Sequence, residues 1–280
     1  MEPNQAPAAG YFRVAQPLPR VYRLEDPRGV FLTLLVGDER AFLADTGMGV
    51  GDAARAVREL TGKPVIAANT HGHIDHTGGN YQFESVWLSP EELPILRDAL
   101  APERRQPILD MEDAPTPPDF DPAGFLGYSG DNLPELRAGQ RFDLGGLTVE
   151  AVPLPTHTRG SMGFFCPELK LLLTGDSLST FVYLVFPESC TISQYLTELD
   201  RIASIPFTRM LSAHERQVMG REHLEAFRRC ALALRPEESV RFRNPLFPDR
   251  PGRMFIYEAP CCSKGYAALV YTKDKLDTTK

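Results

Sequence analysis

Residues 69–80, NTHGHIDHTGGN, place three histidines and one aspartate within six positions: His71, His73, Asp75 and His76. The whole chain contains six histidines, so half of them lie in this segment. In an extended segment, residues two apart point the same way, so His71 and His73 can reach one ion together. Asp75 and His76 follow where the chain turns, so they can address a second point. Imidazole nitrogen and carboxylate oxygen are good zinc ligands and also suit manganese and iron, so the segment predicts a metal site.

Three further residues of the same chemical types follow apolar runs elsewhere in the chain. They are His157 in PTHTRGSMG, Asp176 in LLLTGDSL and His214 in LSAHE. The expected ligands form two sets that Asp176 bridges: His71, His73 and His157 for one ion, and Asp75, His76 and His214 for the other. The two carboxylates in these sets leave about two positive charges of the two divalent ions uncompensated. This residual positive charge lowers the pKa of a metal-bound water toward neutrality.

The candidate ligands need elements that bring them to one edge of the molecule. Short apolar runs at 64–70, 170–176 and 209–215 predict strands that end at a candidate ligand or lead into one. In open α/β sheets, ligands bind beyond the carboxyl ends of the strands, so this placement favours a site there. Further strands are expected at 21–26, 30–37, 41–47, 141–146, 147–155 and 161–167, and helices at 50–62, 89–100, 191–205 and 220–234.

This order of elements predicts an α/β protein made of two similar sheet-plus-helix units that pack sheet against sheet. We expect a single domain over residues 1–280. The proline-rich stretch 102–136 predicts an irregular insertion over one face. Residues 235–280 are expected to form a short C-terminal extension whose strands add to a sheet.

Composition and charge narrow the class of protein. The chain is 42% hydrophobic and 24% charged, which is ordinary for a soluble globular protein. A formal net charge of −7 disfavours a nucleic-acid partner, which needs a basic surface. It does not exclude a small anionic substrate, because a local site can be positive on an acidic protein, and we expect a small-molecule substrate. The sequence has no apolar run long enough for a membrane helix, no signal-peptide pattern at its start and no C-x-x-C pair among its five cysteines. We therefore expect a cytoplasmic protein without a membrane partner, and leave a homodimer open.

The segments THGHIDHTGGN, THTRGSMG, LLLTGDSL and SAHE, in this order, resemble the metal motifs of the metallo-β-lactamase-fold hydrolases. The segment ADTG, which contains Asp45, is similar to an early strand-end motif of that family. The resemblance covers about residues 20–216. It implies an αββα sandwich, two mixed β-sheets flanked by helices, with a dinuclear metal site at one edge of the sheets. It also implies that Asp45 supports the metal loop by orienting a ligand through hydrogen bonds.

Within that family, Asp176 in the bridging position resembles the glyoxalase II-like thioesterases, the lactonases and the phosphodiesterases. The resemblance implies a hydrolase that cleaves a carboxylic ester, thioester or lactone with a hydroxide bridging two divalent ions. Zinc is the first choice of metal, with manganese or iron as alternatives. Phosphodiester or β-lactam hydrolysis at the same ions, or an iron-dependent persulfide-type dioxygenase, stays as an alternative.

Two residues are candidates for direct roles in that chemistry. Asp75 is expected to pass a proton to the leaving group in addition to binding metal. Tyr183, in TFVYLVF, is a candidate oxyanion or substrate contact, because lactonases of this fold place a tyrosine shortly after the bridging aspartate, although closer than here. Arg159 stands where the family often has proline, and it could bring a cation near the site of an anionic substrate.

Overall fold

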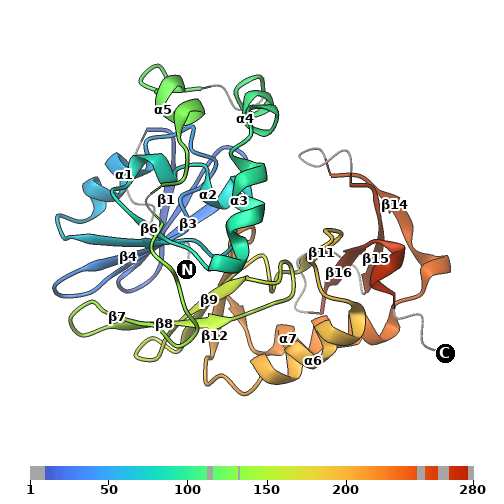
Figure 1. Cartoon of the computed structure of the whole chain (residues 1–280). Helices are drawn as coiled ribbons and strands as arrows, with labels where there is room; N and C mark the ends of the chain where they lie inside the picture. The colour runs from blue at the N-terminus through green and yellow to red at the C-terminus, as the bar shows by residue number, and fades with distance from the viewer. Residues whose placement is uncertain (1–9, 112–115, 132, 245–249, 258–264, 277–280) are drawn as a thin grey trace. The chain divides into compact units, whose positions relative to one another are not determined.

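The computed structural model describes residues 10–111, 116–131, 133–244, 250–257 and 265–276 (Figure 1). Contacts divide the chain into two compact units. Unit 1 comprises residues 1–152 and 164–169, and unit 2 comprises residues 153–163 and 170–280. The candidate ligands are shared between them: His71, His73, Asp75 and His76 belong to unit 1, and His157, Asp176 and His214 belong to unit 2.

Unit 1 contains a six-stranded sheet with the order β1-β2-β3-β4-β5-β6. Its strands are β1 (Arg13–Leu18), β2 (Val21–Glu25), β3 (Phe31–Val36), β4 (Ala41–Ala44), β5 (Val65–Ala68) and β6 (Val86–Trp87). Strands β1 to β4 pair antiparallel, whereas β4, β5 and β6 pair parallel. Because β4 and β5 run in the same direction, Asp45 and the segment that begins at Asn69 leave the sheet at the same edge.

A second layer of strands covers this sheet within unit 1. It consists of β7 (Arg141–Asp143), β8 (Thr148–Pro153) and the end of β9 (Met162–Cys166), which begins in unit 2. The ring of Phe42 in β4 lies 5.3 Å from the ring of Phe142 in β7 and 4.8 Å from that of Phe164 in β9. All three side chains are buried, so the expected packing of sheet against sheet is present in unit 1.

The helices of unit 1 begin with α1 (Ala53–Leu60), whose N-cap residue Asp52 accepts a hydrogen bond from the Arg55 main chain. Its buried side chains, which include Ala56 and Val57, belong to the same apolar core as strands β1 to β6. The helical turns α2 (Ile74–Thr77), η1 (Asn80–Gln82) and η2 (Pro90–Glu92) follow, and then α3 (Leu93–Ala99).

The prediction of an irregular stretch over 102–136 was wrong in part, because two short helices form there. They are α4 (Pro102–Leu109) and α5 (Pro122–Gly127). Each begins with a proline in its first turn, where a missing N–H costs no hydrogen bond. Asp121 also caps α5 by accepting a hydrogen bond from the Gly124 main chain. The prolines therefore start helices here instead of preventing them.

Strand β9 also pairs with strands of unit 2, in the order β9-β10-β12-β13. These strands are β10 (Leu171–Gly175), β12 (Arg209–Ser212) and β13 (Met219–Gly220). Strands β10 and β12 pair parallel, so Asp176 and the segment leading to His214 leave this sheet at the same edge. Helix α6 (Ile192–Ile202) starts at a capping box on Thr191 and contacts α7 (Glu222–Ala233).

A third sheet completes unit 2, with the order β11-β16-β15-β14. Its strands are β11 (Phe181–Leu184), β16 (Ala267–Tyr271), β15 (Gly252–Tyr257) and β14 (Val240–Phe242), with η3 (Pro236–Glu238) and η4 (Lys273–Lys275) beside them. Helix α7 contacts β15 and β16. The prediction of strands in the C-terminal extension is confirmed, and they join β11 in a sheet of their own.

The mixed sheets and flanking helices confirm the predicted α/β class. Over the ranges that the structure describes, none of the helices combines the length and apolar character needed to cross a bilayer.

Candidate metal centre

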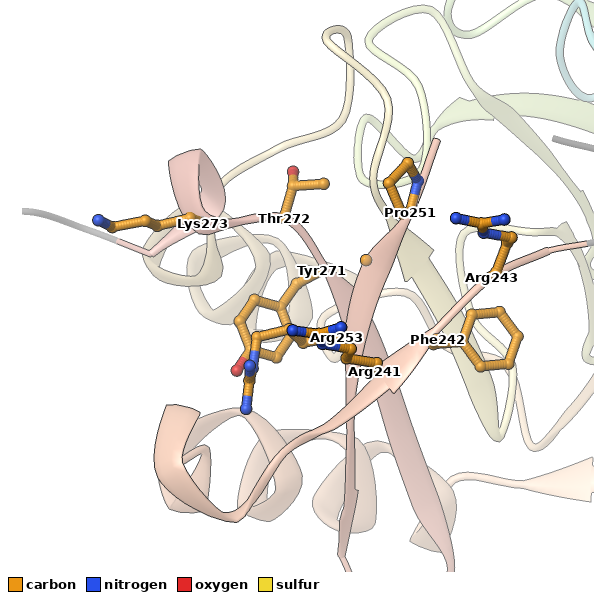
Figure 2. A pocket seen from close by; sticks show the side chains of 9 residues that line it. Arg241, Phe242, Arg243, Pro251, Arg253, Tyr271, Thr272 and Lys273 are labelled. Carbon is orange, nitrogen blue, oxygen red and sulfur yellow. The ribbon is translucent and has the colours of Figure 1, made fainter. Parts of the chain in front are cut away.

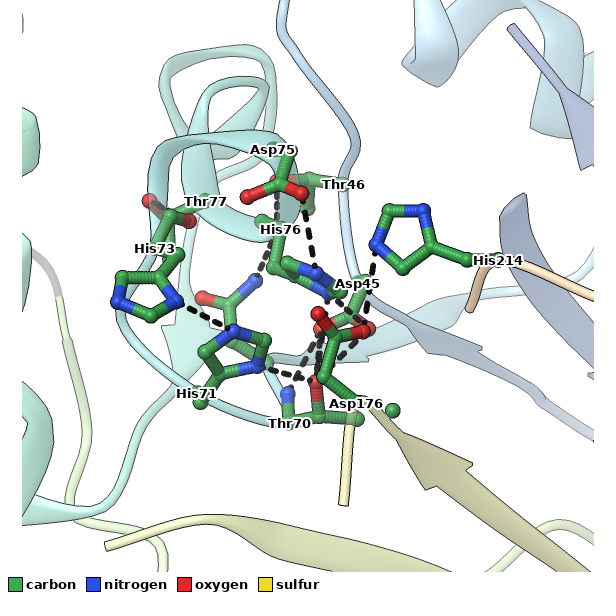
Figure 3. Close-up of polar contacts among 12 residues, drawn as sticks. Asp45, Thr46, Thr70, His71, His73, Asp75, His76, Thr77, Asp176 and His214 are labelled. Carbon is green, nitrogen blue, oxygen red and sulfur yellow. Dashed lines mark hydrogen bonds and ion pairs between the residues drawn. The ribbon is translucent and has the colours of Figure 1, made fainter. Parts of the chain in front are cut away.

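His71 and His73 lie at the end of β5, where the chain leaves the sheet toward α2. The Nε2 atom of His71 is 3.0 Å from the Nδ1 atom of His73, and their rings meet edge to face (Figure 3). Both side chains are buried. Two imidazole nitrogens on one tetrahedral zinc ion lie about 3.3 Å apart, given Zn–N distances of about 2.0–2.1 Å. The pair therefore has the spacing that one shared ion requires.

His76 and Asp75 form the second pair of unit 1, on α2. The Nδ1 atom of His76 is 2.9 Å from Oδ2 of Asp45, and its Nε2 atom is 3.5 Å from Oδ2 of Asp75 (Figure 3). A carboxylate that accepts a hydrogen bond from one ring nitrogen selects the tautomer whose other nitrogen can bind metal. The Nε2 atom of His76 thus faces the same point as the Asp75 carboxylate.

Asp45 is itself held firmly. Its carboxylate accepts hydrogen bonds from the Thr70 main chain at 2.7 Å and from the Thr70 hydroxyl at 2.9 Å. Its backbone has a φ of 63°, a left-handed conformation that is uncommon outside glycine. The hydrogen bonds to Thr70 and His76 offset the cost of that conformation. This geometry agrees with the supporting role that the family resemblance implied for Asp45.

Two further residues position the loop and were not predicted. The Thr70 hydroxyl lies 3.1 Å from Nδ1 of His71, which orients that ring as Asp45 orients His76. The buried Glu92 carboxylate accepts a hydrogen bond of 2.8 Å from the main chain of Gly72, between the two histidines. Thr70 could have been noticed from its place before His71, whereas Glu92 carries no signal in the sequence.

In unit 2, Asp176 lies between two histidines. The Nε2 atom of His157 is 3.7 Å from Oδ2 of Asp176, and Nε2 of His214 is 3.3 Å from Oδ1. The other nitrogen of His157, Nδ1, is 2.8 Å from the main-chain oxygen of Tyr183 and donates a hydrogen bond to it in the tautomer that leaves Nε2 for metal. Each carboxylate oxygen of Asp176 therefore faces a different histidine, and the bridging role stays a prediction.

The loop after Asp176 is tied to the loop that carries His214. The Glu215 carboxylate accepts hydrogen bonds from the Thr180 main chain at 3.0 Å and from the Ser179 hydroxyl at 3.1 Å. Glu215 was not predicted to act here, although it directly follows His214 in the SAHE segment.

Tyr183 and Arg159 stay predictions. The Tyr183 ring packs 5.1 Å from the ring of Phe181 and 5.7 Å from that of Phe242, so it belongs to an aromatic cluster on β11 and β14. Arg159 is exposed in the loop between β8 and β9. Neither arrangement assigns these side chains a contact with substrate.

The donor atoms in each unit fit a divalent metal ion. Imidazoles and carboxylates that converge in a buried place would be costly without a cation to satisfy them. In addition, His71, His76 and His157 each have their second nitrogen next to a hydroxyl, a carboxylate or a carbonyl oxygen, as metal-binding histidines usually do.

Comparison with known proteins identifies the family. The model of the metallo-beta-lactamase superfamily matches residues 26–214, which is more than half of the chain. The chain therefore belongs to the metallo-beta-lactamase superfamily, and the predicted family and fold class are confirmed.

The relatives include proteins whose names describe hydrolysis of thioesters. The chain is 25% identical over 185 residues to Acyl-coenzyme A thioesterase MBLAC2 of Homo sapiens, covering 61% of this chain and 66% of that protein. It is 30% identical over 155 residues to Hydroxyacylglutathione hydrolase GloC of Haemophilus influenzae, covering 52% of this chain and 65% of that protein. The matched stretches thus span slightly less than two thirds of the length of these relatives.

A solved structure shows the same fold. A metallo-beta-lactamase family protein of Thermus thermophilus superposes with a TM-score of 0.55 at 25% identity, covering 77% of this chain and 80% of that one.

Proposed function

We propose that the chain is a metal-dependent hydrolase that splits a thioester with water into a carboxylate and a thiol. The observation that carries the proposal is the buried pair of His71 and His73 beside His76, whose second ring nitrogen is held by Asp45. The two relatives, an acyl-coenzyme A thioesterase and a hydroxyacylglutathione hydrolase by name, support a thioester as the substrate class.

The proposed site holds two divalent ions, with zinc as the first choice and manganese or iron as alternatives. His71, His73 and His157 would hold one ion, Asp75, His76 and His214 would hold the other, and Asp176 would bridge them. The two oxygens of Asp176, each directed at a different histidine, support the bridging role.

When bound, such ions supply an activated water and polarise the substrate carbonyl. The residues of the chain then have two tasks. Asp45 and Thr70 hold the histidines in place, so that little reorganisation is needed during the reaction. Asp75 receives the proton of the attacking water and passes it to the leaving sulfur. A carbon–oxygen bond forms, the carbon–sulfur bond breaks, and the products are a carboxylate and a neutral thiol, while the second proton of the water is released to solvent.

The finer alternatives follow from the same site. An ester or lactone presents the same carbonyl with an oxygen leaving group, whereas phosphodiester hydrolysis, β-lactam hydrolysis and iron-dependent oxygenation require other substrates. In each case the proposed substrate is a small molecule, and a cytoplasmic location and a homodimer remain predictions.

Turnover by the protein loaded with zinc or manganese tests the proposal. The substrate panel holds a lactoyl-glutathione, an acyl-coenzyme A, an acyl-homoserine lactone, a chromogenic cephalosporin and a bis-nitrophenyl phosphate. We expect turnover of a thioester, reduced about a hundredfold or more by Asp176→Asn and unchanged by Asp200→Asn, an exposed carboxylate in the same unit. Turnover of the cephalosporin or phosphodiester alone would reject the thioesterase, and oxygen uptake with a persulfide by an iron-loaded protein would indicate the dioxygenase.

A further inference from the structure

The C-terminal sheet of unit 2 carries a cationic pocket of about 450 Å³ (Figure 2). Four of the residues that line it are basic, and two are aromatic: Arg241, Arg243, Arg253 and Lys273, and Phe242 and Tyr271. We call it the arginine pocket. Over the described ranges of the chain, no acidic residue lines it. The chain as a whole has a formal net charge of −7, so the positive charge of this pocket is opposite in sign to that of the chain.

Two of these cations face each other across a pair of strands. Arg241 of β14 is the direct partner of Arg253 of β15, and Arg253 is in turn the partner of Tyr271 in β16. Figure 2 shows the two arginines beside the Tyr271 ring. Like charges directly opposite each other destabilise an antiparallel pair. An anion bound between them would remove that repulsion.

Arg253 is already oriented for such a role. Its Nη2 atom donates a hydrogen bond of 2.8 Å to the main-chain oxygen of Pro236 and another to that of Ser239. The Ser239 hydroxyl is 2.8 Å from the hydroxyl of the buried Tyr271. The base of the pocket is thus fixed, whereas Arg241, Arg243 and Lys273 are exposed and can close on a ligand.

The pocket is linked to the metal ligands of unit 2 by packed aromatic rings. Phe242, which lines the pocket, lies 5.7 Å from the ring of Tyr183, whose main-chain oxygen lies 2.8 Å from Nδ1 of His157. Phe186, in the same apolar cluster, lies 5.3 Å from the His157 ring. The register places Phe242 and Tyr183 on one face of the sheet and the facing Arg241 and Arg253 on the other. A thioester with its acyl end at His157 would therefore extend its thiol carrier along the aromatic face and around the edge strand β14 to reach the arginine pocket.

We infer that the arginine pocket binds the phosphate groups of a phosphorylated thiol carrier, so that the substrate is a thioester of a coenzyme A-type nucleotide. This inference rests on the proposed thioester hydrolysis. A diphosphate and a phosphomonoester bring about four negative charges at neutral pH, which match four cations. Guanidinium groups suit phosphate oxygens because their paired N–H donors form two parallel hydrogen bonds. Glutathione suits the pocket less well, because its ammonium group would meet four cations and no carboxylate.

Binding without turnover tests the pocket independently of the chemistry. Adenosine 3′,5′-bisphosphate, which has a 3′-phosphate and one 5′-phosphate in place of the diphosphate and has no thiol, is titrated into the protein by calorimetry. We expect saturable binding that weakens about tenfold in Arg241→Gln and again in the double variant Arg241→Gln/Arg243→Gln. Arg209→Gln, which removes an exposed arginine at the start of β12 in the same unit, should bind as the unaltered protein does. No binding, or equal affinity in all variants, would overturn the inference.

A series of thioesters with one acyl group then separates the inference from the proposed function. The carriers are coenzyme A, its 3′-dephospho form, pantetheine and glutathione. We expect KM to rise as phosphates are removed while kcat stays within about twofold, and Arg241→Gln to raise KM about tenfold for coenzyme A but not for pantetheine. Equal KM values across the series, or a preference for glutathione, would overturn the pocket and leave the thioesterase intact. Failure of all thioesters would reject the proposed function while the calorimetry still decides on the pocket.

Discussion

The Nδ1 atom of His76 lies 2.9 Å from Oδ2 of Asp45, and both side chains are buried. This contact presents the Nε2 atom of His76 toward Asp75. Replacing Asp45 with asparagine keeps the shape of the side chain but removes its charge. Because such outer partners raise ligand basicity, we expect metal affinity to fall about 10–100-fold, measured by competition with a chelator.

The control for Asp45→Asn is Asp200→Asn, which neutralises an exposed carboxylate paired with Arg228. It should leave metal affinity unchanged. Equal affinity in both variants would show that Asp45 does not tune the ligand.

The side chain and main chain of Tyr183 have separable roles. Its carbonyl oxygen holds His157 through the main chain, so Tyr183→Phe leaves that contact in place. If the hydroxyl contacts the oxyanion, kcat should fall about 10- to 100-fold with unchanged metal content. Steady-state kinetics with metal analysis measure both, and Tyr22→Phe on β2 serves as the matched control. An unchanged kcat would show that the Tyr183 hydroxyl does not contact the oxyanion.

Position 72 has no room for a side chain. A Cβ atom at this position would lie 2.7 Å from the Glu92 main-chain oxygen and 3.0 Å from the Leu96 nitrogen. Gly72→Ala must therefore move the loop between His71 and His73, and we expect a loss of about 1–3 kcal/mol in the free energy of unfolding. Urea denaturation measures this change, and metal affinity should fall with it.

Gly62→Ala is the matched control, because a Cβ atom there would meet nothing within 4 Å. It should change the free energy of unfolding by less than about 1 kcal/mol. A Gly72→Ala protein as stable as this control would contradict the close contact with Glu92.

Asp26 provides a prediction for the effect of pH. Burial is the main cause that raises the pKa of its carboxyl group to about 6. Hydrogen bonds from the Arg28 and Val30 main chains act in the opposite direction and lower the pKa. The unfolded chain releases this proton near pH 3.9, so the folded state holds it over a higher range. The contribution of Asp26 to stability is thus lost as pH rises from about 4 to about 6, and the buried carboxylate destabilises the fold above that range.

Asp26→Asn keeps an oxygen for both main-chain donors and removes the charge. In the metal-depleted protein at pH 8, we expect the free energy of unfolding to rise by about 1–3 kcal/mol. At pH 4 the difference should vanish. Urea denaturation at the two pH values measures this difference, and Asp38→Asn, at an exposed carboxylate, is the control. The same gain in the free energy of unfolding at both pH values would contradict the raised pKa.

The sequence predicted the elements whose signal is local. Strands such as β3 and β10 are continuous apolar runs, and the candidate ligands were visible because histidine is rare and clustered in NTHGHIDHTGGN. Strand β1 was missed because RVAQPL mixes polar residues and proline. Strand β11 was not predicted as a strand because its partner, β16, lies far along the chain.

Residues that position the candidate ligands were harder to predict than the candidate ligands themselves. Glu92 acts by accepting one hydrogen bond from Gly72, twenty positions away, and the sequence around it shows only the start of a helix. Glu215 likewise acts on Thr180 through a contact that only the fold creates. A carboxylate that holds a main-chain N–H leaves no periodic pattern, so such residues require the structure.

The pairing of β11 with β16 has a consequence for how the protein is made. The Tyr183 carbonyl that holds His157 sits on β11, an edge strand whose partner within the third sheet is residues 267–271. During synthesis, that partner leaves the ribosome long after His71, His73 and His157 have done so. A nascent chain therefore exposes its ligands before the strand that orients His157 is available. The orientation of His157 by the Tyr183 carbonyl is thereby delayed until residues 267–271 have been made.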